Sequence, residues 1–373
     1  MKIFYITEGY LDQKNGTTSH IKGFIEGMRT AGLDVLSFLR RDDSTGSVEI
    51  PEVNIALLGT LLSQKKMLDA VMSAAKNSKP ALIFGRVEYQ SIAPWLAARR
   101  LRVPLVADLN GDLEFQMRER SFRERVLSRY TEYNFLKSAS RIIVTSAAMA
   151  ERVGKRLAIS LDKFRVLPMG IADNFFGALT DRDEARKILN IPQNIYSILF
   201  VGHLNEWQGV EELIRLAKSF KDCELWIAGE GSSKNKFEIM ARGLPVRFLG
   251  AFEPEKMPLL LSSADILIQP PRREEHVGMP TRMAEYLASG KPVIASDRHR
   301  TENEFARQGL IFTADFKKPE DVMSLLGRIR KDISAFAPML LDAQEYAKNY
   351  LRWSSIGKSL FEIFEEVRND YSD

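Results

Sequence analysis

Strand-like apolar runs alternate with helical patterns along almost the whole chain, and this alternation restricts the fold more than any other feature. It is typical of repeated βα units whose strands join parallel sheets. The predicted strands lie at 2–7, 34–39, 81–85, 104–109 and 141–146, and then at 197–202, 223–229, 246–250, 265–270 and 291–296. We therefore expect an α/β protein with two doubly wound sheets.

The length of 373 residues also suits two domains. The segment 165–195 combines Pro, Gly and Asp residues that break regular structure, so we place the junction there. The predicted domains span 1–170 and 171–350, and 351–373 forms a C-terminal helix that crosses back to the first domain. Two such Rossmann-like domains would face one another across a cleft lined by the carboxyl ends of their strands, where open α/β sheets bind ligands.

Several functional classes are excluded by simple counts. One cysteine and four scattered histidines give no spacing that suits a structural zinc site. No G-x-G-x-x-G follows the first strand, which argues against a nicotinamide-binding domain. We find no signal peptide and no run of the roughly 20 apolar residues that a membrane span needs, so a cytoplasmic location is expected.

The most informative segment is 276–297, where a loop leads into a short helix and then a strand. Backbone N–H groups at such a helix start form an anion site suited to a diphosphate. The loop residues predicted to contact it are Gly278, Met279, Pro280 and Thr281. Glu285, one turn further on, has two oxygens that match the vicinal hydroxyls of a ribose. The alternative is that Glu285 is only a favourable charge near a helix N-terminus.

Four segments together resemble the retaining GT-B glycosyltransferases of the family 4 type. EYLASGKPVIAS (285–296) is similar to the end of the family's E-x7-E signature, and NGTTSHIKGFIEGMRTAGLDV (15–35) to its first loop and helix. RVLPMGIADNFF (165–176) and ILFVGHLNEWQGVEELI (198–214) resemble two further motifs in the same order. The resemblance implies a hexosyltransferase that moves a sugar from a nucleotide-diphosphate donor to a glycan, lipid-linked or small-molecule acceptor, with retention and without a cofactor.

The chain departs from the family at several donor contacts. His203 and Gln208 stand where the family has Arg and Lys, Val277 replaces the first Glu of E-x7-E, and Asn110 replaces a histidine after a strand. These departures leave two alternatives open: a nucleotide-sugar-binding partner or regulatory subunit without catalysis, and a nucleotide-sugar epimerase.

A departing diphosphate needs a cation to stabilise its charge. Arg282 is our first choice, and Arg272 with Arg273 the second. Asp181 and Asp183 form the only Asp-x-Asp pair, but they are better explained as helix-capping charges than as metal ligands, so no metal is expected.

The predicted site has a catalytic and a donor-binding group of residues. The catalytic group consists of Arg282, Asn110 and Glu275, the last of which follows Glu274. The donor-binding group adds Gly16 and Thr17 at the first helix start, Gly202 with His203 and Gln208, and Phe252, which either stacks on the base or belongs to the core. His20 and Asp108 are weaker candidates beside Asn110, with packing and turn-capping as the alternatives.

The first half of the chain is basic, with 26 Lys and Arg against 19 Asp and Glu in residues 1–180. Five arginines fall in MRERSFRERVLSR (117–129), which we predict to form one helix. Such a patch favours peripheral contact with anionic lipids at the inner face of a membrane. Because glutamates are interspersed, a solvated, salt-bridged surface is the stronger interpretation. Nucleic acid binding has no support beyond the mild basicity.

Overall fold

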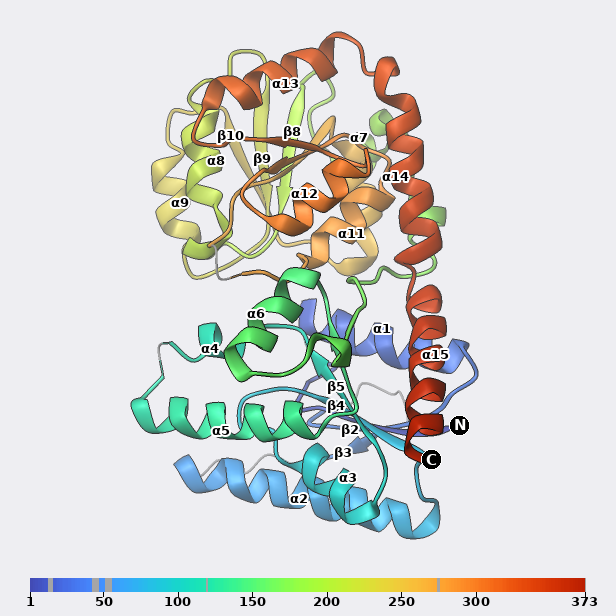
Figure 1. The fold of residues 1–373 in the computed structure, drawn as a ribbon. Helices are drawn as coiled ribbons and strands as arrows, with labels where there is room; N and C mark the ends of the chain where they lie inside the picture. The colour runs from blue at the N-terminus through green and yellow to red at the C-terminus, as the bar shows by residue number, and fades with distance from the viewer. Residues whose placement is uncertain (13–15, 42–46, 51–55, 119, 274–275, 373) are drawn as a thin grey trace. The chain divides into compact units, whose positions relative to one another are not determined.

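The structure is a computed structural model that describes residues 1–12, 16–41, 47–50, 56–118, 120–273 and 276–372. The chain divides into two compact units (Figure 1). The first consists of Met1–Gly170 together with Trp353–Asp373, and the second of Ile171–Arg352. Among the described residues, no helix has both the length and the apolar content that a membrane crossing requires.

The first unit is built on a seven-stranded sheet in which every pair of neighbouring strands is parallel. Its strands, in spatial order, are β3 (Val48–Glu49), β2 (Asp34–Leu39), β1 (Lys2–Ile6), β4 (Leu82–Arg86), β5 (Leu105–Leu109), β6 (Arg141–Val144) and β7 (Phe164–Val166). The chain runs outward from β1 in one direction and then in the other, so the order reverses between β1 and β4. In open α/β sheets this reversal marks the usual ligand site.

Helices cover both faces of this sheet (Figure 1). They are α1 (Gly16–Thr30), α2 (Ala56–Asn77), α3 (Ala93–Leu101), α4 (Leu113–Gln116), α5 (Phe122–Ser138), α6 (Ala147–Leu157) and α15 (Trp353–Ser372). The C-terminal helix predicted within 351–373 is present as α15. Its apolar residues at helical spacing are all buried, namely Ile356, Leu360, Ile363, Phe364 and Val367.

Helices α1 and α15 form one side of the first core, packed on strand residues such as Ile3 and Tyr5. Their backbones meet at two glycines. A Cβ atom on Gly357 would lie 1.9 Å from the carbonyl oxygen of Gly27, and one on Gly27 would lie 2.2 Å from the carbonyl oxygen of Trp353. Neither position therefore has room for a side chain.

The second unit contains a six-stranded sheet, again entirely parallel. Its strands, in spatial order, are β10 (Val246–Gly250), β9 (Glu224–Ala228), β8 (Ser197–Val201), β11 (Ile266–Gln269), β12 (Val293–Ser296) and β13 (Phe312–Ala314). Here the order reverses between β8 and β11, which places the expected ligand site after Val201 and Gln269.

The helices of this unit follow its strands in the manner of βα repeats. They are α7 (Arg182–Leu189), α8 (Val210–Ala217), α9 (Lys234–Met240), α10 (Met257–Ser263), α11 (Thr281–Ala288), α12 (Arg300–Arg307), α13 (Pro319–Lys331) and α14 (Ala337–Tyr350). Short 3-10 helices lie at Phe175–Ala178, Glu206–Gln208, Pro254–Lys256 and Ser334–Phe336 in this unit, and at Leu161–Lys163 in the first.

The predicted α/β class with two doubly wound sheets is confirmed, and all ten predicted strands are present. The prediction missed β3, β7 and β13, which have only two or three residues each and lie at sheet edges. The single helix predicted over 117–129 is wrong, because α5 begins only at Phe122. Ser121 is the N-cap of α5 and forms a capping box with Glu124, so the helix cannot extend to the residues before it.

Candidate functional site

Polar side chains gather at the carboxyl ends of the strands in both units, next to the two points where strand order reverses. In the second unit the central side chain is Arg282, in the first turn of α11. It is 9% exposed, although arginine is seldom buried without a paired charge.

Neutral groups surround the Arg282 guanidinium. Nη2 donates to Gln208 Oε1 at 2.6 Å, and Nη1 donates to Gln269 Oε1 at 3.2 Å. The guanidinium carbon lies 4.7 Å from the centre of the Phe200 ring. A Cβ atom on Gly202 would approach Nη2 to 2.6 Å, so glycine is what allows the guanidinium to lie directly over the end of β8.

No carboxylate among the described residues lies within 4 Å of this guanidinium, whose positive charge is therefore buried without a counter-ion. Burial lowers the pKa of Arg282 to about 10, which still leaves it protonated at neutral pH. A buried cation bonded only to amide oxygens is costly by itself and provides a strong site for an anion.

Glu285 lies three residues after Arg282 and is partly buried. Burial raises the pKa of its carboxyl to about 7, against the opposing effect of Arg282. Within the described part of the chain the carboxyl has no hydrogen-bond donor. Its acceptor capacity is thus available to a ligand.

The loop before α11 ends at Pro280, whose side chain provides no N-cap. The backbone N–H groups of Thr281 and Arg282 find no acceptor in the described chain, as is usual for a helix start. Gly278 is partly exposed, whereas Met279 and Pro280 are buried. The site thus combines one unneutralised guanidinium with two N–H groups of the same helix turn.

Arg272 has a different place from the one predicted as second choice for the phosphate. It is buried, its Nη2 donates to the buried Glu302 at 2.8 Å, and its Nη1 donates to the carbonyl oxygens of His276 and Gly278, each at 3.1 Å. Arg272 therefore ties the loop before α11 to helix α12. Arg273 is exposed.

The remaining predicted donor contacts vary in their surroundings. Gln208 belongs to the Arg282 cluster, whereas His203 is exposed and Phe252 is partly buried just after β10. Glu274 and Glu275 lie outside the described residues.

The predicted capping role of Asp181 is confirmed, since its carboxylate accepts from the N–H of Glu184 at 2.9 Å. Asp183 pairs with the neighbouring Arg182 at 2.8 Å. Across the described residues, no three His, Cys, Asp or Glu side chains gather as metal ligands would.

In the first unit, His20, Asp108 and Asn110 form one hydrogen-bonded cluster. Asn110 Nδ2 donates to Asp108 Oδ1 at 2.9 Å and lies 2.7 Å from His20 Nε2. His20 and Asp108 are almost fully buried, while Asn110 is partly exposed. Burial lowers the pKa of His20, which favours its neutral form. The Asn110 amide is therefore fixed by two buried neighbours.

The sequence prediction missed the residues that surround this cluster. Tyr5 from β1 and Arg86 from β4 each donate to Asp108 Oδ2 at 3.4 Å. Arg86 also lies 3.3 Å from Glu88, whose carboxylate accepts from the Glu8 N–H at 2.6 Å. Burial raises the pKa of Glu88 to about 7. The sequence feature that could have indicated Arg86 and Glu88 is the GRVE run (85–88), which places two charged residues at the end of a buried strand.

Gly16 and Thr17 are the first two residues of α1, as predicted. Residues 13–15, which precede them, lie outside the described part of the chain. His20 belongs to the next turn of the same helix and packs between Phe24 and Trp353, with ring centres 4.1 Å and 5.6 Å away.

Comparison with known proteins gives consistent matches along the chain. A family model described as Glycosyl transferases group 1 matches residues 181–349, and one described as Glycosyltransferase Family 4 matches residues 14–175. The chain is 24% identical over 289 residues to alpha-D-kanosaminyltransferase from Streptomyces kanamyceticus, covering 74% of this chain and 73% of that protein.

Solved structures share the fold over nearly the full length. Sucrose-phosphate synthase from Thermosynechococcus elongatus superimposes with a TM-score of 0.77 at 17% identity, covering 99% of both chains. HepE from Anabaena, solved in complex with UDP and glucose, gives a TM-score of 0.75 at 18% identity and covers 98% of this chain and all of that one.

Proposed function

Since this chain belongs to the GT-B glycosyltransferases of the family 4 type and is a glycosyltransferase enzyme, we propose that it transfers a sugar from a nucleotide-diphosphate donor without a metal ion or other cofactor. The main observation in support of this proposal is the buried Arg282 guanidinium, which has no counter-ion among the described residues. A diphosphate would supply the missing negative charge.

In this proposal the second unit binds the donor. Arg282 and the N–H groups at the start of α11 hold the diphosphate, with Gly278 and Gly202 allowing close approach of the ligand to the backbone. Glu285 accepts hydrogen bonds from the two ribose hydroxyls. Phe252 and His203 complete the nucleotide contacts.

Gln208 has a specific role in this arrangement. The family's lysine at this position would repel a guanidinium 2.6 Å away, whereas the Gln208 amide oxygen accepts from it. We infer that Arg282 takes over the diphosphate charge that the Arg and Lys of the family motif carry elsewhere. Loss of that pair is then compensated inside the same site.

The chemical step breaks the bond between the anomeric carbon and the diphosphate oxygen and forms a bond to an acceptor hydroxyl oxygen. The hydroxyl proton leaves to the departing diphosphate, whose extra negative charge Arg282 stabilises. Retention of anomeric configuration is part of the proposal by resemblance to the family. Asn110 of the first unit, held by Asp108 and His20, and Glu275 of the second would bind sugar hydroxyls. Gly16 and Thr17 would add backbone N–H contacts to the donor diphosphate.

The donor nucleotide and acceptor are proposed only as classes. UDP bound to HepE, which shares this fold, makes UDP the first nucleotide to test. The acceptor would be a glycan, a small molecule or a lipid-linked sugar, bound by an enzyme in the cytoplasm that contacts the inner face of the membrane.

The test is titration of wild type, Arg282→Gln and Arg282→Lys with nucleoside diphosphates and monophosphates. We expect Arg282→Gln to weaken diphosphate binding about 10- to 100-fold and monophosphate binding much less, because a charge-assisted hydrogen bond contributes about 1.5–3 kcal/mol. Equal diphosphate affinity in wild type and Arg282→Gln would overturn the assignment of Arg282.

Donor turnover tests the reaction itself. Wild type should release nucleoside diphosphate from a sugar donor when acceptor is present. Nucleotide binding with no turnover of any donor would favour a binding partner, and an isomerised donor without acceptor would favour an epimerase.

A further inference from the structure

The Asn110 side chain uses both of its amide hydrogens inside the protein. Its Nδ2 donates to Asp108 Oδ1 at 2.9 Å and lies 2.7 Å from His20 Nε2. An asparagine amide has two N–H donors on its nitrogen and an acceptor on its oxygen. With Asp108 and His20 as partners, the nitrogen has no hydrogen left for a ligand.

Asp108 determines which end of this amide faces inward. Its carboxylate is buried and lies 3.4 Å from the Arg86 guanidinium, which favours the ionised form that can only accept hydrogen bonds. In a reversed amide, the oxygen of Asn110 would lie 2.9 Å from a carboxylate oxygen, and two acceptors at that distance repel one another. The NH2 group of Asn110 must therefore face Asp108.

The same arrangement determines the protonation of His20. Because the amide nitrogen of Asn110 donates to Nε2, the ring proton of His20 is on Nδ1. Burial lowers the pKa of His20, which favours this neutral form. Nδ1 is buried with no hydrogen-bond acceptor among the described residues, and the ring makes a T-shaped contact with Trp353. A protonated Nε2 would instead direct a hydrogen at the amide hydrogens of Asn110.

The amide oxygen is the part of Asn110 that remains for a ligand. Asn110 is partly exposed, and within the described residues no group donates to its Oδ1. This oxygen has two lone pairs and no hydrogen, so it can bind only a hydrogen-bond donor. The buried neighbours of Asn110 thus fix the polarity of the group that it presents.

We propose that Asn110 binds its sugar through the amide oxygen alone, so that the bound substituent must be a hydrogen-bond donor. His20 and Asp108 are the positioning residues that set this polarity, because together they take up both amide hydrogens. The inference rests on the proposed function, in which Asn110 contacts a sugar. It adds the chemical class of the group that is bound there.

This polarity selects among sugars. A hydroxyl or an amino substituent can donate to Oδ1, whereas the carboxylate of a uronic acid cannot and is repelled by it. A position that lacks its hydroxyl leaves Oδ1 without a donor, and a site built to bind a hydroxyl discriminates against such an analogue. The sugar bound at Asn110 therefore has a hydroxyl or amino group at that position.

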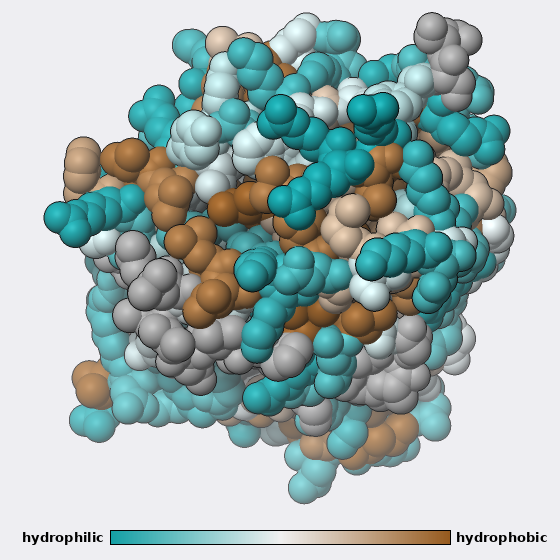
Figure 2. Space-filling model, turned by 90° about the horizontal axis from the view of Figure 1, so that it is seen from below, coloured by the Kyte–Doolittle hydropathy of each residue, from teal (hydrophilic) through white to brown (hydrophobic). Residues whose placement is uncertain are grey.

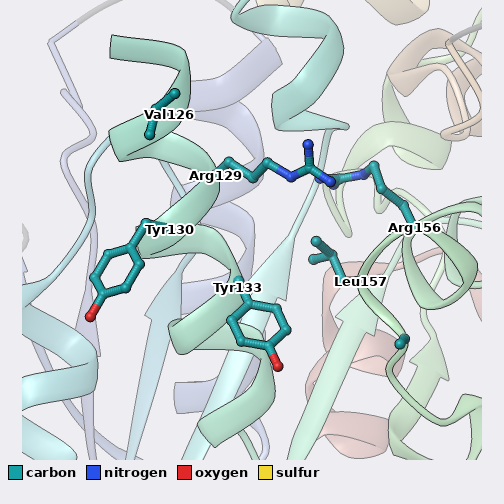
Figure 3. A pocket seen from close by; sticks show the side chains of 7 residues that line it. Val126, Arg129, Tyr130, Tyr133, Arg156 and Leu157 are labelled. Carbon is teal, nitrogen blue, oxygen red and sulfur yellow. The ribbon is translucent and has the colours of Figure 1, made fainter. Parts of the chain in front are cut away.

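Other surface features define the chemistry of a ligand less closely. A pocket of about 450 Å³ lies between α5 and α6, and Figure 3 shows Arg129 and Arg156 pointing toward one another there. Arg156 is already bonded to Glu132 at 2.6 Å. Figure 2 shows apolar patches among charged side chains on the face seen from below. None of these features fixes the polarity of a ligand group as the Asn110 cluster does.

The arginines of 117–129 form only part of the salt-bridged surface that the sequence favoured. Arg120 lies 3.7 Å from Glu124. Arg123, Arg125 and Arg129 are exposed, and none has a carboxylate within 4 Å in the described part of the chain. The salt-bridged surface therefore does not extend to these three arginines.

The tautomer of His20 tests the geometry without any substrate. Long-range proton–nitrogen NMR spectra of the full chain distinguish a ring protonated at Nδ1 from one protonated at Nε2, and His20→Gln identifies the signals of His20. At neutral pH we expect the proton on Nδ1. A proton on Nε2, or a charged ring, would overturn the proposal.

Deoxyfluoro sugars test the selectivity. In a sugar substrate that wild type turns over, each hydroxyl is replaced in turn by fluorine, which cannot donate a hydrogen bond. We expect one position at which the replacement lowers kcat/KM about tenfold more in wild type than in Asn110→Ala. Fluorine also changes the reactivity of the sugar, so the same analogue is compared in both proteins.

Variants of His20 separate positioning from packing. His20→Leu frees one amide hydrogen of Asn110, so the preference for hydroxyl over fluorine should fall to about threefold or less. His20→Gln can accept through its own amide oxygen and should keep most of the preference. Phe24→Leu is the matched control, because Phe24 packs on His20 with ring centres 4.1 Å apart. It should lower stability and leave the preference unchanged.

Two kinetic results would also overturn the proposal: equal effects of fluorine in wild type and Asn110→Ala at every position, or an undiminished preference in His20→Leu. Absence of turnover with every sugar donor would instead contradict the proposed function. Because the His20 tautomer is measured with no donor present, the two failures are distinguishable.

Discussion

Gly202 allows the guanidinium of Arg282 to lie over the end of a strand, and the contact is sensitive to one added carbon. An alanine Cβ would lie 2.6 Å from Nη2 and 2.7 Å from the guanidinium carbon. The end of an arginine side chain moves more easily than backbone, so the guanidinium should move away and leave Gln208 and Gln269.

We therefore expect Gly202→Ala to lower nucleoside diphosphate affinity about tenfold while changing the free energy of unfolding by less than about 1 kcal/mol. Calorimetric titration and chemical denaturation measure the two effects. Gly327→Ala is the control, because its new Cβ would have no atom within 4 Å beyond the neighbouring backbone of its own helix. Unchanged affinity in Gly202→Ala would show that the position of the guanidinium is not what binds the anion.

Glu285 should make stability depend on pH. Burial raises its pKa to about 7 in the folded chain, against a reference value of 4.5. The folded state therefore holds the proton more tightly, and this stabilisation is complete below pH 4.5 and lost as pH rises toward 7 and above. Glu285→Gln has no such loss.

The unfolding free energy of Glu285→Gln relative to wild type should thus increase by about 2–3 kcal/mol between pH 5 and pH 8. Denaturant titrations at both values, with exposed Glu238→Gln as control, measure the change. A constant difference across this range would mean that the carboxyl is not desolvated. Ribose binding should change with pH in the opposite sense to stability, since it needs the ionised carboxylate.

At the scale of elements, the pair formed by Arg272 and Glu302 fixes the loop that precedes α11. Glu302 is fully buried on α12, and Arg272 also donates hydrogen bonds to two carbonyl oxygens of the loop. Removing one member leaves the other charge buried and unpaired, which is far more costly than replacing both.

Glu302→Gln should accordingly lower the free energy of unfolding by about 3–5 kcal/mol, and the double variant Arg272→Met with Glu302→Leu by clearly less. Chemical denaturation of Arg272→Met, Glu302→Leu and their double variant gives the coupling directly. Additive losses would show that the pair is not coupled. Diphosphate affinity should fall in every variant that frees the loop.

Much of the element order could be predicted from sequence because buried parallel strands are continuous apolar runs. Strand β2 was predicted with its observed bounds of Asp34–Leu39. The edge strands β3 and β7 could not be found, because two or three residues carry no periodicity. The start of α5 was missed because the capping box at Ser121 competes with a strong helical pattern on both sides.

The candidate site divides in the same way. Arg282 and Glu285 were predicted because both stand on one local motif, and Asn110 because it follows a strand. The pairing of these residues was not predicted. Gln208 was named as a donor contact but not as a partner of Arg282, 74 positions away, and Arg86, 22 positions from Asp108, was missed. Which distant polar groups meet is decided by strand order, and the sequence pattern alone does not encode that order.

For the whole molecule, the contact between α1 and α15 joins the two ends of the chain within one unit. Alanine normally stabilises a helix interior relative to glycine by about 1 kcal/mol. At Gly357 the added Cβ would instead meet backbone of α1 at 1.9 Å.

We expect Gly357→Ala to destabilise the first unit by about 1–3 kcal/mol, whereas Gly327→Ala in α13 stabilises the second. Hydrogen exchange distinguishes the units: amides of β1 and β4 should lose protection in Gly357→Ala, and those of β8 and β11 should not. Equal loss in both sheets would indicate that the two units unfold together.

The same contact has a consequence for synthesis on the ribosome. Residues 1–170 emerge first, yet their core lacks α15 until all of Ile171–Arg352 has been made. The apolar residues of α1 and β1 that pack on α15 therefore stay uncovered while the intervening unit is translated. During that time nascent-chain chaperones can bind them.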